Sequence, residues 1–227
     1  MAPPNDTTPL PISLRINRTI CTVIGYGPVG QRKAELLAAA GAVLRVVDPR
    51  ADRLTPDAHP HWEWIAAAYD PEHLTGSRLI VAAATPDINR QVVADARARG
   101  LWISSASDPE QSDFEFPAVG RLGQLSLAIS TNGTSPTLAR RLRTSLLASL
   151  DPMIKEWIDI LSELRSEVLH TLPDEPRRYQ LLNHFADESW LVLLHTTSPD
   201  EVRSRMRQAI QDAGASLGIM PGSSPPG

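Results

Sequence analysis

The sequence contains one cysteine, no long apolar run and no excess of basic residues. The cysteine, Cys21, cannot form a disulfide within the chain, and its place at the start of an expected strand favours a small buried side chain over a nucleophile. No apolar run reaches the roughly 18 residues of a membrane span, and the polar N-terminus lacks the apolar core of a signal peptide. We therefore expect a cytoplasmic protein that does not insert into a membrane.

The charge balance excludes some classes of partner. Twenty-two basic residues against 26 acidic ones give a net charge of −4. Binding to nucleic acid or to a membrane surface needs a basic excess, so we expect neither partner. His59 and His61 have no further ligands nearby in the sequence, and we interpret them as surface residues and expect no metal site there.

Residues 22–48 have the pattern of a nucleotide-binding strand–helix–strand unit. The strand expected over 22–24 leads into Gly25, Gly27 and Gly30, the G-x-G-x-x-G turn, and a helix is predicted over 31–40. The three glycines permit a tight turn, the approach of a pyrophosphate to bare backbone, and close packing of the helix on the sheet. The N-terminus of the helix adds N–H groups and a positive dipole end. This pattern predicts an α/β protein with a parallel sheet and a dinucleotide site.

The acid that ends the second strand points to the cofactor. The strand expected over 43–47 ends at Asp48, whose carboxylate can accept both hydroxyls of a ribose and repel a 2′-phosphate. The pattern therefore favours NAD over NADP, and Arg50 close by weakens that preference. The alternative is a Rossmann fold whose site no longer binds a nucleotide. The predicted contacts are the loop residues Gly25, Tyr26, Gly27, Pro28, Val29 and Gly30, together with Asp48.

Two further strands end in polar residues. The strand expected over 78–84 is followed by Thr85 and Asp87, with Asp87 as the predicted cap of a helix through about residue 99. The strand expected over 101–107 is followed by Asp108. Ligands of open parallel sheets lie beyond the carboxyl ends of the strands, so Thr85 and Asp87 are predicted to contact the cofactor.

The pattern changes after residue 113. Segments 114–118 and 125–130 predict a hairpin around a turn at 120–123. Ser135 as N-cap and Pro136 as first residue then start a helix predicted over 137–150. That helix carries Arg140, Arg141 and Arg143. Two interpretations stay open for this patch: a carboxylate or phosphate site, or a solvated helix face.

The last third reads as a small helical unit. Helices are predicted over 153–170, 175–186, 188–194 and 199–213, the last with Ser198 as cap. The ends, 1–9 and 214–227, are expected to be flexible. His170, His184 and His195 are scattered along these helices and are interpreted as structural.

Several short collinear segments, taken together, resemble the siroheme-synthase dehydrogenase family, whose members are precorrin-2 dehydrogenases and in some cases also sirohydrochlorin ferrochelatases. The segment at 130–143 is the most specific, because the glycine motif is shared by many unrelated nucleotide binders. The matching segments are PISLR (11–15), VIGYGPVGQRKAELLAAAGA (23–42), VVD (46–48), AAAT (82–85), SASD (105–108), FPA (116–118) and STNGTSPTLARRLR (130–143).

The resemblance implies an architecture and a reaction. It implies an NAD-binding Rossmann domain over 10–115, a dimerisation and substrate region over 116–150 and a helical domain over 151–213, in a homodimer. It implies the oxidation of precorrin-2 to sirohydrochlorin with NAD⁺, with insertion of Fe²⁺ or Co²⁺ as an open further activity. The rival function from another class is a non-catalytic NAD-sensing domain of a channel or transporter, which has no need of the 130–143 loop.

The resemblance also assigns roles to residues. Asp108 falls on the catalytic aspartate, and a carboxylate at the crevice edge can act as base for a dehydrogenation. The departures from the family pattern include Ser105, which stands where many members have Asn, and Asn89, which is closer to Thr85 than usual, so its cofactor contact stays open. Many members also lack an acid at the position of Asp48, so its role rests on the general Rossmann pattern. The residues expected to bind the carboxylates of the tetrapyrrole are Ser130, Thr131, Asn132, Gly133, Thr134, Ser135, Arg140 and Arg143.

Overall fold

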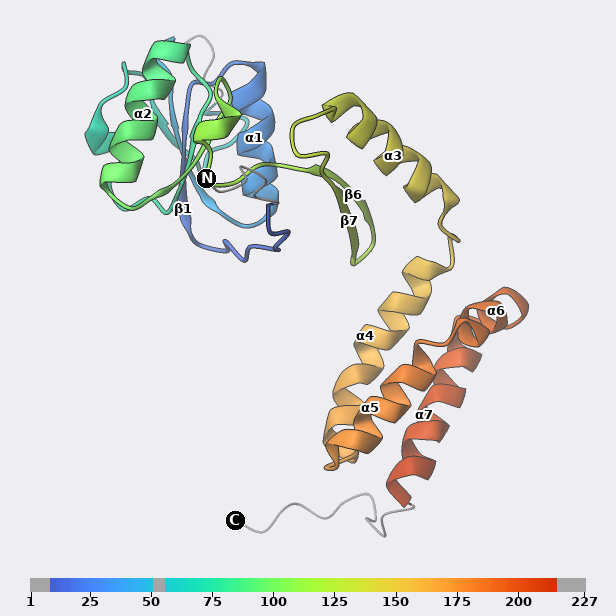
Figure 1. Cartoon of the computed structure of the whole chain (residues 1–227). Coiled ribbons are helices and arrows are strands. Elements are labelled where there is room, and N and C mark those ends of the chain that lie inside the picture. The colour runs from blue at the N-terminus through green and yellow to red at the C-terminus, as the bar shows by residue number, and fades with distance from the viewer. Residues whose placement is uncertain (1–8, 51–55, 216–227) are drawn as a thin grey trace, which may run out of the picture. The chain divides into compact units, whose positions relative to one another are not determined.

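The computed structural model describes residues 9–50 and 56–215, and the chain divides into two compact units between Phe116 and Pro117 (Figure 1). The ends predicted to be flexible, 1–9 and 214–227, lie outside the described residues except for positions 9, 214 and 215. Gly214 and Ala215 belong to the last helix. The further division into a region over 116–150 and a helical domain over 151–213 stays a prediction.

The first unit is built on a five-stranded parallel sheet in the order β3-β2-β1-β4-β5. Ile24 pairs with Val47 and with Ala82, and Ala82 pairs with Ser105, so the carboxyl ends of four strands are level at one edge. This sheet confirms the predicted Rossmann-like α/β class. The strands are β1 (Ile20–Ile24), β2 (Val43–Val47), β3 (Glu63–Ile65), β4 (Leu79–Ala82) and β5 (Trp102–Ser105).

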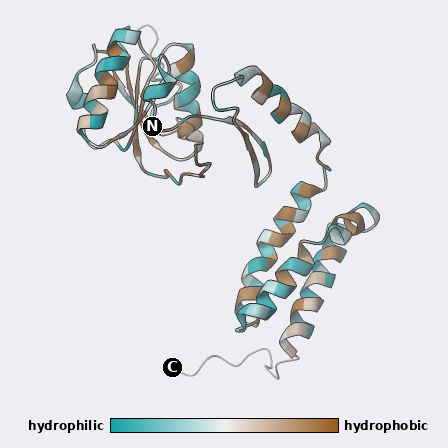
Figure 2. Ribbon diagram, in the orientation of Figure 1, coloured by the Kyte–Doolittle hydropathy of each residue, from teal (hydrophilic) through white to brown (hydrophobic). Residues whose placement is uncertain are grey.

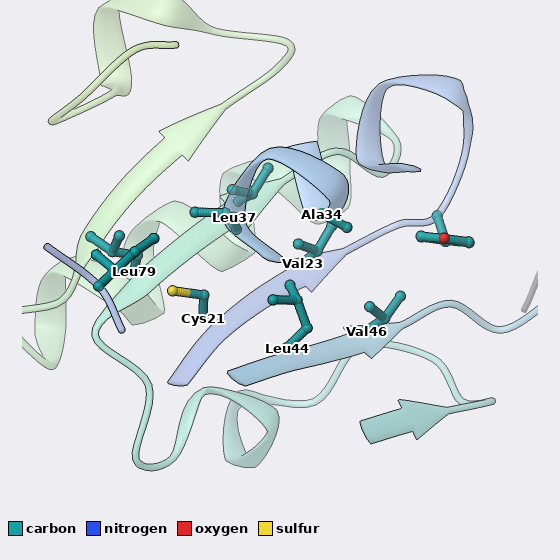
Figure 3. Packing of buried hydrophobic residues seen from close by; sticks show 10 residues of the cluster. Cys21, Val23, Ala34, Leu37, Leu44, Val46 and Leu79 are labelled. Atoms are coloured by element: carbon teal, nitrogen blue, oxygen red, sulfur yellow. The ribbon is translucent and has the colours of Figure 1, made fainter. Parts of the chain in front are cut away.

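Helices α1 (Pro28–Ala39) and α2 (Pro86–Ala98) cover opposite faces of the sheet. Successive side chains of a strand point to opposite faces. Accordingly Val23 packs in the cluster that contains Leu37 of α1, whereas Ile24 packs in the cluster that contains Val92 of α2. Figure 3 shows the α1 side of this core. Two short 3₁₀ turns, η2 (Pro71–Leu74) and η3 (Pro109–Gln111), complete the unit.

Cys21 lies in the middle of this core and is fully buried (Figure 3). Burial disfavours the thiolate and raises the pKa of the Cys21 thiol to about 11. The prediction of a small buried side chain is confirmed.

Both helices start earlier than the sequence predicts. Proline at the first helical position already has the required φ, so α1 starts at Pro28 rather than at residue 31, and α2 starts at Pro86. Thr85 occupies the N-cap position of α2, and Asp87 lies in the first turn, where its carboxylate is paired with Arg90. The prediction that Asp87 caps the helix is therefore wrong.

The second unit opens with a hairpin of β6 (Ala118–Leu122) and β7 (Leu125–Ile129). The predicted hairpin is confirmed, but its turn lies at Gly123, with φ +58°, rather than over 120–123. Gly120 lies inside β6. A glycine is needed there because α3 (Pro136–Ser149) packs against it: a Cβ on Gly120 would stand 2.1 Å from Leu147 Cδ1. The sequence cannot separate a packing glycine from a turn glycine.

Four helices complete the second unit: α4 (Ile154–Thr171), α5 (Glu175–Phe185), α6 (Glu188–Thr196) and α7 (Pro199–Ala215). Their core contains Ile160, Leu164 and Met206, and the helices are amphipathic (Figure 2). Arg203 of α7 forms ion pairs with Glu156 and Glu163 of α4 at 2.7 and 3.1 Å. No helix within residues 9–50 and 56–215 has the length and apolar character needed to cross a bilayer.

Candidate functional site

The glycine loop between β1 and α1 depends on the absence of two side chains. Gly25 has φ +92°, and a Cβ there would stand 2.5 Å from the carbonyl oxygen of Ala83. A Cβ on Gly30 would stand 1.9 Å from the carbonyl oxygen of Gly25. Both distances are far below van der Waals contact, so only glycine permits this turn and the close seating of α1 against it.

Gly27, unlike Gly25 and Gly30, has open space at the position that a side chain would occupy. It is the N-cap residue of α1, and nothing lies within 4 Å of the point where its Cβ would stand. No side chain caps this helix end. The first N–H groups of a helix have no partner inside the helix, so the space beside Gly27 is a cradle in which a phosphate can contact bare backbone. The loop therefore fits a dinucleotide.

Asp48 holds this loop in place. Its side chain is only 2% exposed; Oδ2 accepts a hydrogen bond from the backbone N–H of Tyr26 at 2.7 Å, and Oδ1 accepts one from the N–H of Arg50 at 2.8 Å. The carboxylate thus ties the end of β2 to the glycine loop. The sequence analysis missed this role, although an acid beside a turn rich in N–H donors is a signal for it. Its contact with a ribose stays a prediction.

Tyr26 presents its backbone rather than its ring to the site. The residue is 3% exposed, and its ring packs edge-on against Trp64, with 5.1 Å between the ring centroids. Any contact of Tyr26 with a cofactor would come from its main chain. Pro28 and Val29 are exposed at the start of α1, and their contacts with the cofactor stay predictions.

Asn89 connects the ends of β4 and β5. Its side chain is 1% exposed; Oδ1 accepts a hydrogen bond from the N–H of Ala84 at 2.9 Å, and Nδ2 donates to Ser107 Oγ at 2.9 Å. A side chain bonded in this way fixes the loop that follows each strand. Asn89 is thus a positioning residue in this structure, a role that its short spacing from Thr85 did not reveal.

Asp108 follows Ser107 at the same edge of the sheet. It is half-buried, occupies the N-cap position of η3 without a side-chain capping hydrogen bond, and lines a hollow of about 290 Å³. The polar residues that share this hollow are Arg90, Arg97, Ser105, Ser107 and Gln111. The arginines were not singled out from the sequence, because they lie seven residues apart on a helix and meet Asp108 only in the fold.

Thr85 and Asp87 lie at the start of α2, on the same edge. Both are exposed, and Asp87 is paired with Arg90. Their predicted contacts with the cofactor stay predictions.

The loop over 130–135 in the second unit is held by its own hydroxyls. Ser130 Oγ accepts a hydrogen bond from the N–H of Asn132 at 2.9 Å, and Thr131 Oγ1 accepts one from the N–H of Ser135 at 3.0 Å. Asn132 and Gly133 have positive φ values of 49° and 78°. Ser135 Oγ accepts from the N–H of Leu138, so the predicted N-cap is confirmed. Gly133 and Thr134 are exposed at the tip.

Arg140 and Arg143 lie one turn apart on α3. Each guanidinium donates to a threonine of the same helix, Arg140 to Thr137 and Arg143 to Thr144, both at 3.2 Å. These are weak local contacts, which a bound anion can replace. The assignment of this patch and of the 130–135 loop to substrate binding stays a prediction. Within the described ranges, no group of three or more histidine, cysteine or acidic residues has the arrangement of a metal site.

A parallel sheet of this order, with a glycine loop and an open helix N-terminus at the carboxyl ends of its strands, defines a dinucleotide-binding protein of the Rossmann class. Comparisons with known proteins agree. Residues 12–118 match the family model described as putative NAD(P)-binding, and residues 123–149 match the one described as sirohaem biosynthesis protein central.

The relatives specify the family. The siroheme synthase of Chromobacterium violaceum is 36% identical over 208 residues, which cover 90% of this chain and 44% of that protein. Siroheme synthase 1 of Aeromonas salmonicida is 40% identical over 162 residues, 70% of this chain and 35% of that protein. The chain belongs to the siroheme synthase N-terminal family, as the sequence segments predicted. It spans less than half the length of these relatives.

A solved structure described as "SirC, precorrin-2 dehydrogenase" has the same fold. Its TM-score is 0.68, and the match covers 89% of this chain and 99% of that chain at 23% identity. At this level of identity the match supports the fold alone, over the part of the chain that it covers.

Proposed function

We propose that this chain oxidises precorrin-2 to sirohydrochlorin with NAD⁺ as hydride acceptor. In this reaction the tetrapyrrole loses a hydride to the nicotinamide and a proton to a base, so one NADH and one proton form for each sirohydrochlorin. The relatives named siroheme synthase and the fold of the precorrin-2 dehydrogenase support the substrate.

One observation supports this proposal most directly: the cofactor cradle and a carboxylate lie at the same edge of one sheet. Gly27 follows β1, and Asp108 comes three residues after the end of β5, with only β4 between these strands. When NAD⁺ is bound, it supplies the hydride acceptor. Asp108 is half-buried and ends a loop that Asn89 fixes, and we propose that its carboxylate accepts the proton.

The second unit is proposed to recognise the substrate. The tetrapyrrole carries several carboxylates, and the exposed tip of the 130–135 loop, with Arg140 and Arg143 on the following helix, offers N–H groups and guanidinium groups that suit them. The further insertion of Fe²⁺ or Co²⁺ into sirohydrochlorin removes protons from pyrrole nitrogens, a step that the same carboxylate can assist.

We also propose a homodimer formed through α3. Leu138, Leu142 and Leu146 repeat every four residues along one stripe of this helix and are 49, 41 and 45% exposed. Such a stripe is typical of a face that packs against another helix. Leu142→Lys is expected to yield a monomer in analytical ultracentrifugation, whereas Thr144→Lys, an exposed position outside the leucine stripe of the same helix, should leave the dimer intact. A wild-type monomer would contradict this proposal.

The dehydrogenase is tested with the purified full chain, precorrin-2 and either NAD⁺ or NADP⁺. We expect sirohydrochlorin and NADH with NAD⁺, and a rate about 10²–10⁴ times lower in Asp108→Asn, the usual cost of losing a general base. Glu110→Gln, two residues away on η3, is the matched control and should retain the rate. Full activity in Asp108→Asn would remove this residue from the mechanism.

The same experiment separates the alternatives. A wild-type chain that binds NAD⁺ tightly but does not turn over precorrin-2 would favour the NAD-sensing function. Adding Fe²⁺ or Co²⁺ to sirohydrochlorin, with formation of the metal complex followed by its absorption spectrum, tests the chelatase activity separately.

A further inference from the structure

The hollow beside Asp108 contains a pair of arginines for which the dehydrogenation itself has no use. Arg90, Ala94 and Arg97 lie on one face of α2, at the i, i+4 and i+7 spacing that places side chains in a row. Ser105, the last residue of β5, and Ser107, two residues further along the chain, also line the hollow. The hollow thus runs along the outer edge of the sheet, beside β5, whereas the cofactor cradle at Gly27 follows β1.

The size of the hollow limits what can occupy it. Its volume of about 290 Å³ is at the lower end of the range for small-molecule pockets. A whole tetrapyrrole does not fit in such a space, but a single side arm of two or three carbons with a terminal carboxylate does.

The charges of the hollow favour an anion. Two guanidinium groups and the one carboxylate of Asp108 leave a net positive charge among its lining residues. Arg97 donates to the side-chain and main-chain oxygens of Gln111, both of which are neutral. Arg90 is paired with Asp87, whose side chain is 83% exposed, and exposed ion pairs of this kind contribute at most about 1 kcal/mol. A ligand carboxylate can therefore replace either partner at little cost.

The two serines of the hollow, Ser105 and Ser107, add hydrogen-bond donors. Ser105 is 5% exposed, and Ser107 Oγ already accepts a hydrogen bond from Asn89, which directs the hydroxyl hydrogen of Ser107 elsewhere. A hydroxyl in this state can donate to a carboxylate. Asn89 thus places Ser107, whose hydroxyl hydrogen can turn from Ser105 Oγ, 3.5 Å away, to a ligand.

We propose that this hollow is a subsite for one carboxylate arm of the substrate, with Arg90 and Arg97 as its ligands. The proposal rests on the proposed function and deepens it. An arm anchored here fixes the macrocycle next to Asp108, so the two arginines act as positioning residues and select tetrapyrroles that carry a carboxylate at that place. They take no part in the transfer of hydride or proton.

The test uses the full chain with Arg90→Gln, Arg97→Gln and the double variant. Arg99→Gln is the matched control, because Arg99 ends the same helix, pairs with Glu72 and does not line the hollow. Sirohydrochlorin binding is followed by its absorption spectrum, NAD⁺ binding by calorimetry, and KM and kcat with precorrin-2. We expect each single variant to weaken sirohydrochlorin binding and raise KM about tenfold, the loss for one charge-assisted hydrogen bond.

If the two arginines only position the substrate, the affinities for NAD⁺ and for sirohydrochlorin should change differently. NAD⁺ affinity should match the wild type in all variants, and Arg90→Lys should recover part of the sirohydrochlorin affinity, because the charge is kept. If the wild type binds and oxidises precorrin-2 but the double variant binds sirohydrochlorin within twofold of the wild type, the subsite is refuted and the proposed function stands. If the wild type binds no tetrapyrrole, both proposals fail.

Discussion

Two loops of this chain lead into helices that start with proline, and they satisfy their backbone groups in opposite ways. The 25–30 loop before α1 has no side-chain cap, is locked from behind by the buried Asp48, and leaves open space at Gly27. The 130–135 loop before α3 is capped by Ser135 and uses the hydroxyls of Ser130 and Thr131 on its own N–H groups.

The difference shows how each loop can serve a ligand. The first loop is held by Asp48 and presents N–H groups directly, which suits a phosphate held in one position. The second is exposed, has positive φ at Asn132 and Gly133, and presents hydroxyls and nearby arginines. Such a surface suits the carboxylates of a larger substrate.

The glycine loop can be broken in two separable ways. In Gly30→Ala the new Cβ would overlap the carbonyl oxygen of Gly25, so we expect loss of about 3 kcal/mol or more of folding stability together with loss of NAD⁺ binding. In Gly27→Ala the Cβ enters empty space, so the melting temperature should stay near that of the wild type while NAD⁺ binding falls at least tenfold. Thermal unfolding and calorimetric titration of both variants measure the contrast. Unchanged NAD⁺ affinity in Gly27→Ala would show that the cofactor does not approach at this point.

A substitution of Asp48 tests how much its hydrogen bonds to the first loop contribute to folding stability. Asp48→Ala removes both carboxylate oxygens, so the N–H groups of Tyr26, which is buried, and of Arg50 lose their acceptors. A buried donor left without a partner costs about 1–3 kcal/mol, and we expect chemical denaturation to show a loss of this size. The ratio of NAD⁺ to NADP⁺ affinity, measured on the same variant, tests the predicted contact with the ribose. A variant as stable as the wild type would contradict the locking role.

Ser135 tests the opposite arrangement in the second loop. Ser135→Ala removes the side-chain acceptor of the Leu138 N–H, and loss of an N-cap costs about 1 kcal/mol. We expect a small fall in stability and, because this loop is not part of the cofactor cradle, no change in NAD⁺ affinity. A fall in NAD⁺ affinity without a change in stability would show that the two loops share one ligand.

Lys33 of α1 gives a different kind of effect, a dependence of stability on pH. Burial, followed by repulsion from Arg32, lowers its pKa from 10.5 to about 8, and its ammonium lies 3.8 Å from the centroid of the Phe116 ring. Between pH 8 and the ordinary lysine value the unfolded chain binds more protons than the folded chain, so stability should rise with pH across this window. Lys33→Met should remove that rise. The chain has only two lysines, Lys33 and Lys155, so NMR of isotope-labelled lysine can follow the titration directly; a Lys33 that titrates at the ordinary value would contradict the shift.

Much of the fold follows from local signals in the sequence. Buried β-branched runs, the glycine motif and Ser135 with Pro136 each act through nearby backbone, so they predicted the strands, the first loop and the start of α3. The starts of α1 and α2 were misplaced by a few residues because Pro28 and Pro86 were not treated as first helical residues. The turn of the hairpin was misplaced because Gly120 serves to pack against Leu147, which is 27 residues away in the chain.

The sequence predicted which chemical groups lie at the site but not which hydrogen bonds they form. The sequence placed Asp48 and Asp108 at strand ends, yet it could not show that Asp48 points inward to the N–H of Tyr26 or that Asn89 bonds to Ser107. The hollow with Arg90 and Arg97 was missed altogether, since its residues come from α2 and from the loop after β5 and meet only once the sheet has formed.

The most direct test is the stoichiometry of the reaction catalysed by the purified full chain with precorrin-2 and NAD⁺. We predict one NADH for each sirohydrochlorin formed in the wild type, and, with NAD⁺ well below its dissociation constant, NADH formation at least ten times slower in Gly27→Ala, whose fold we expect to be intact. Sirohydrochlorin formed without NADH, or NAD⁺ bound by the wild type with no oxidation of precorrin-2, would contradict an NAD-dependent dehydrogenase built on this loop.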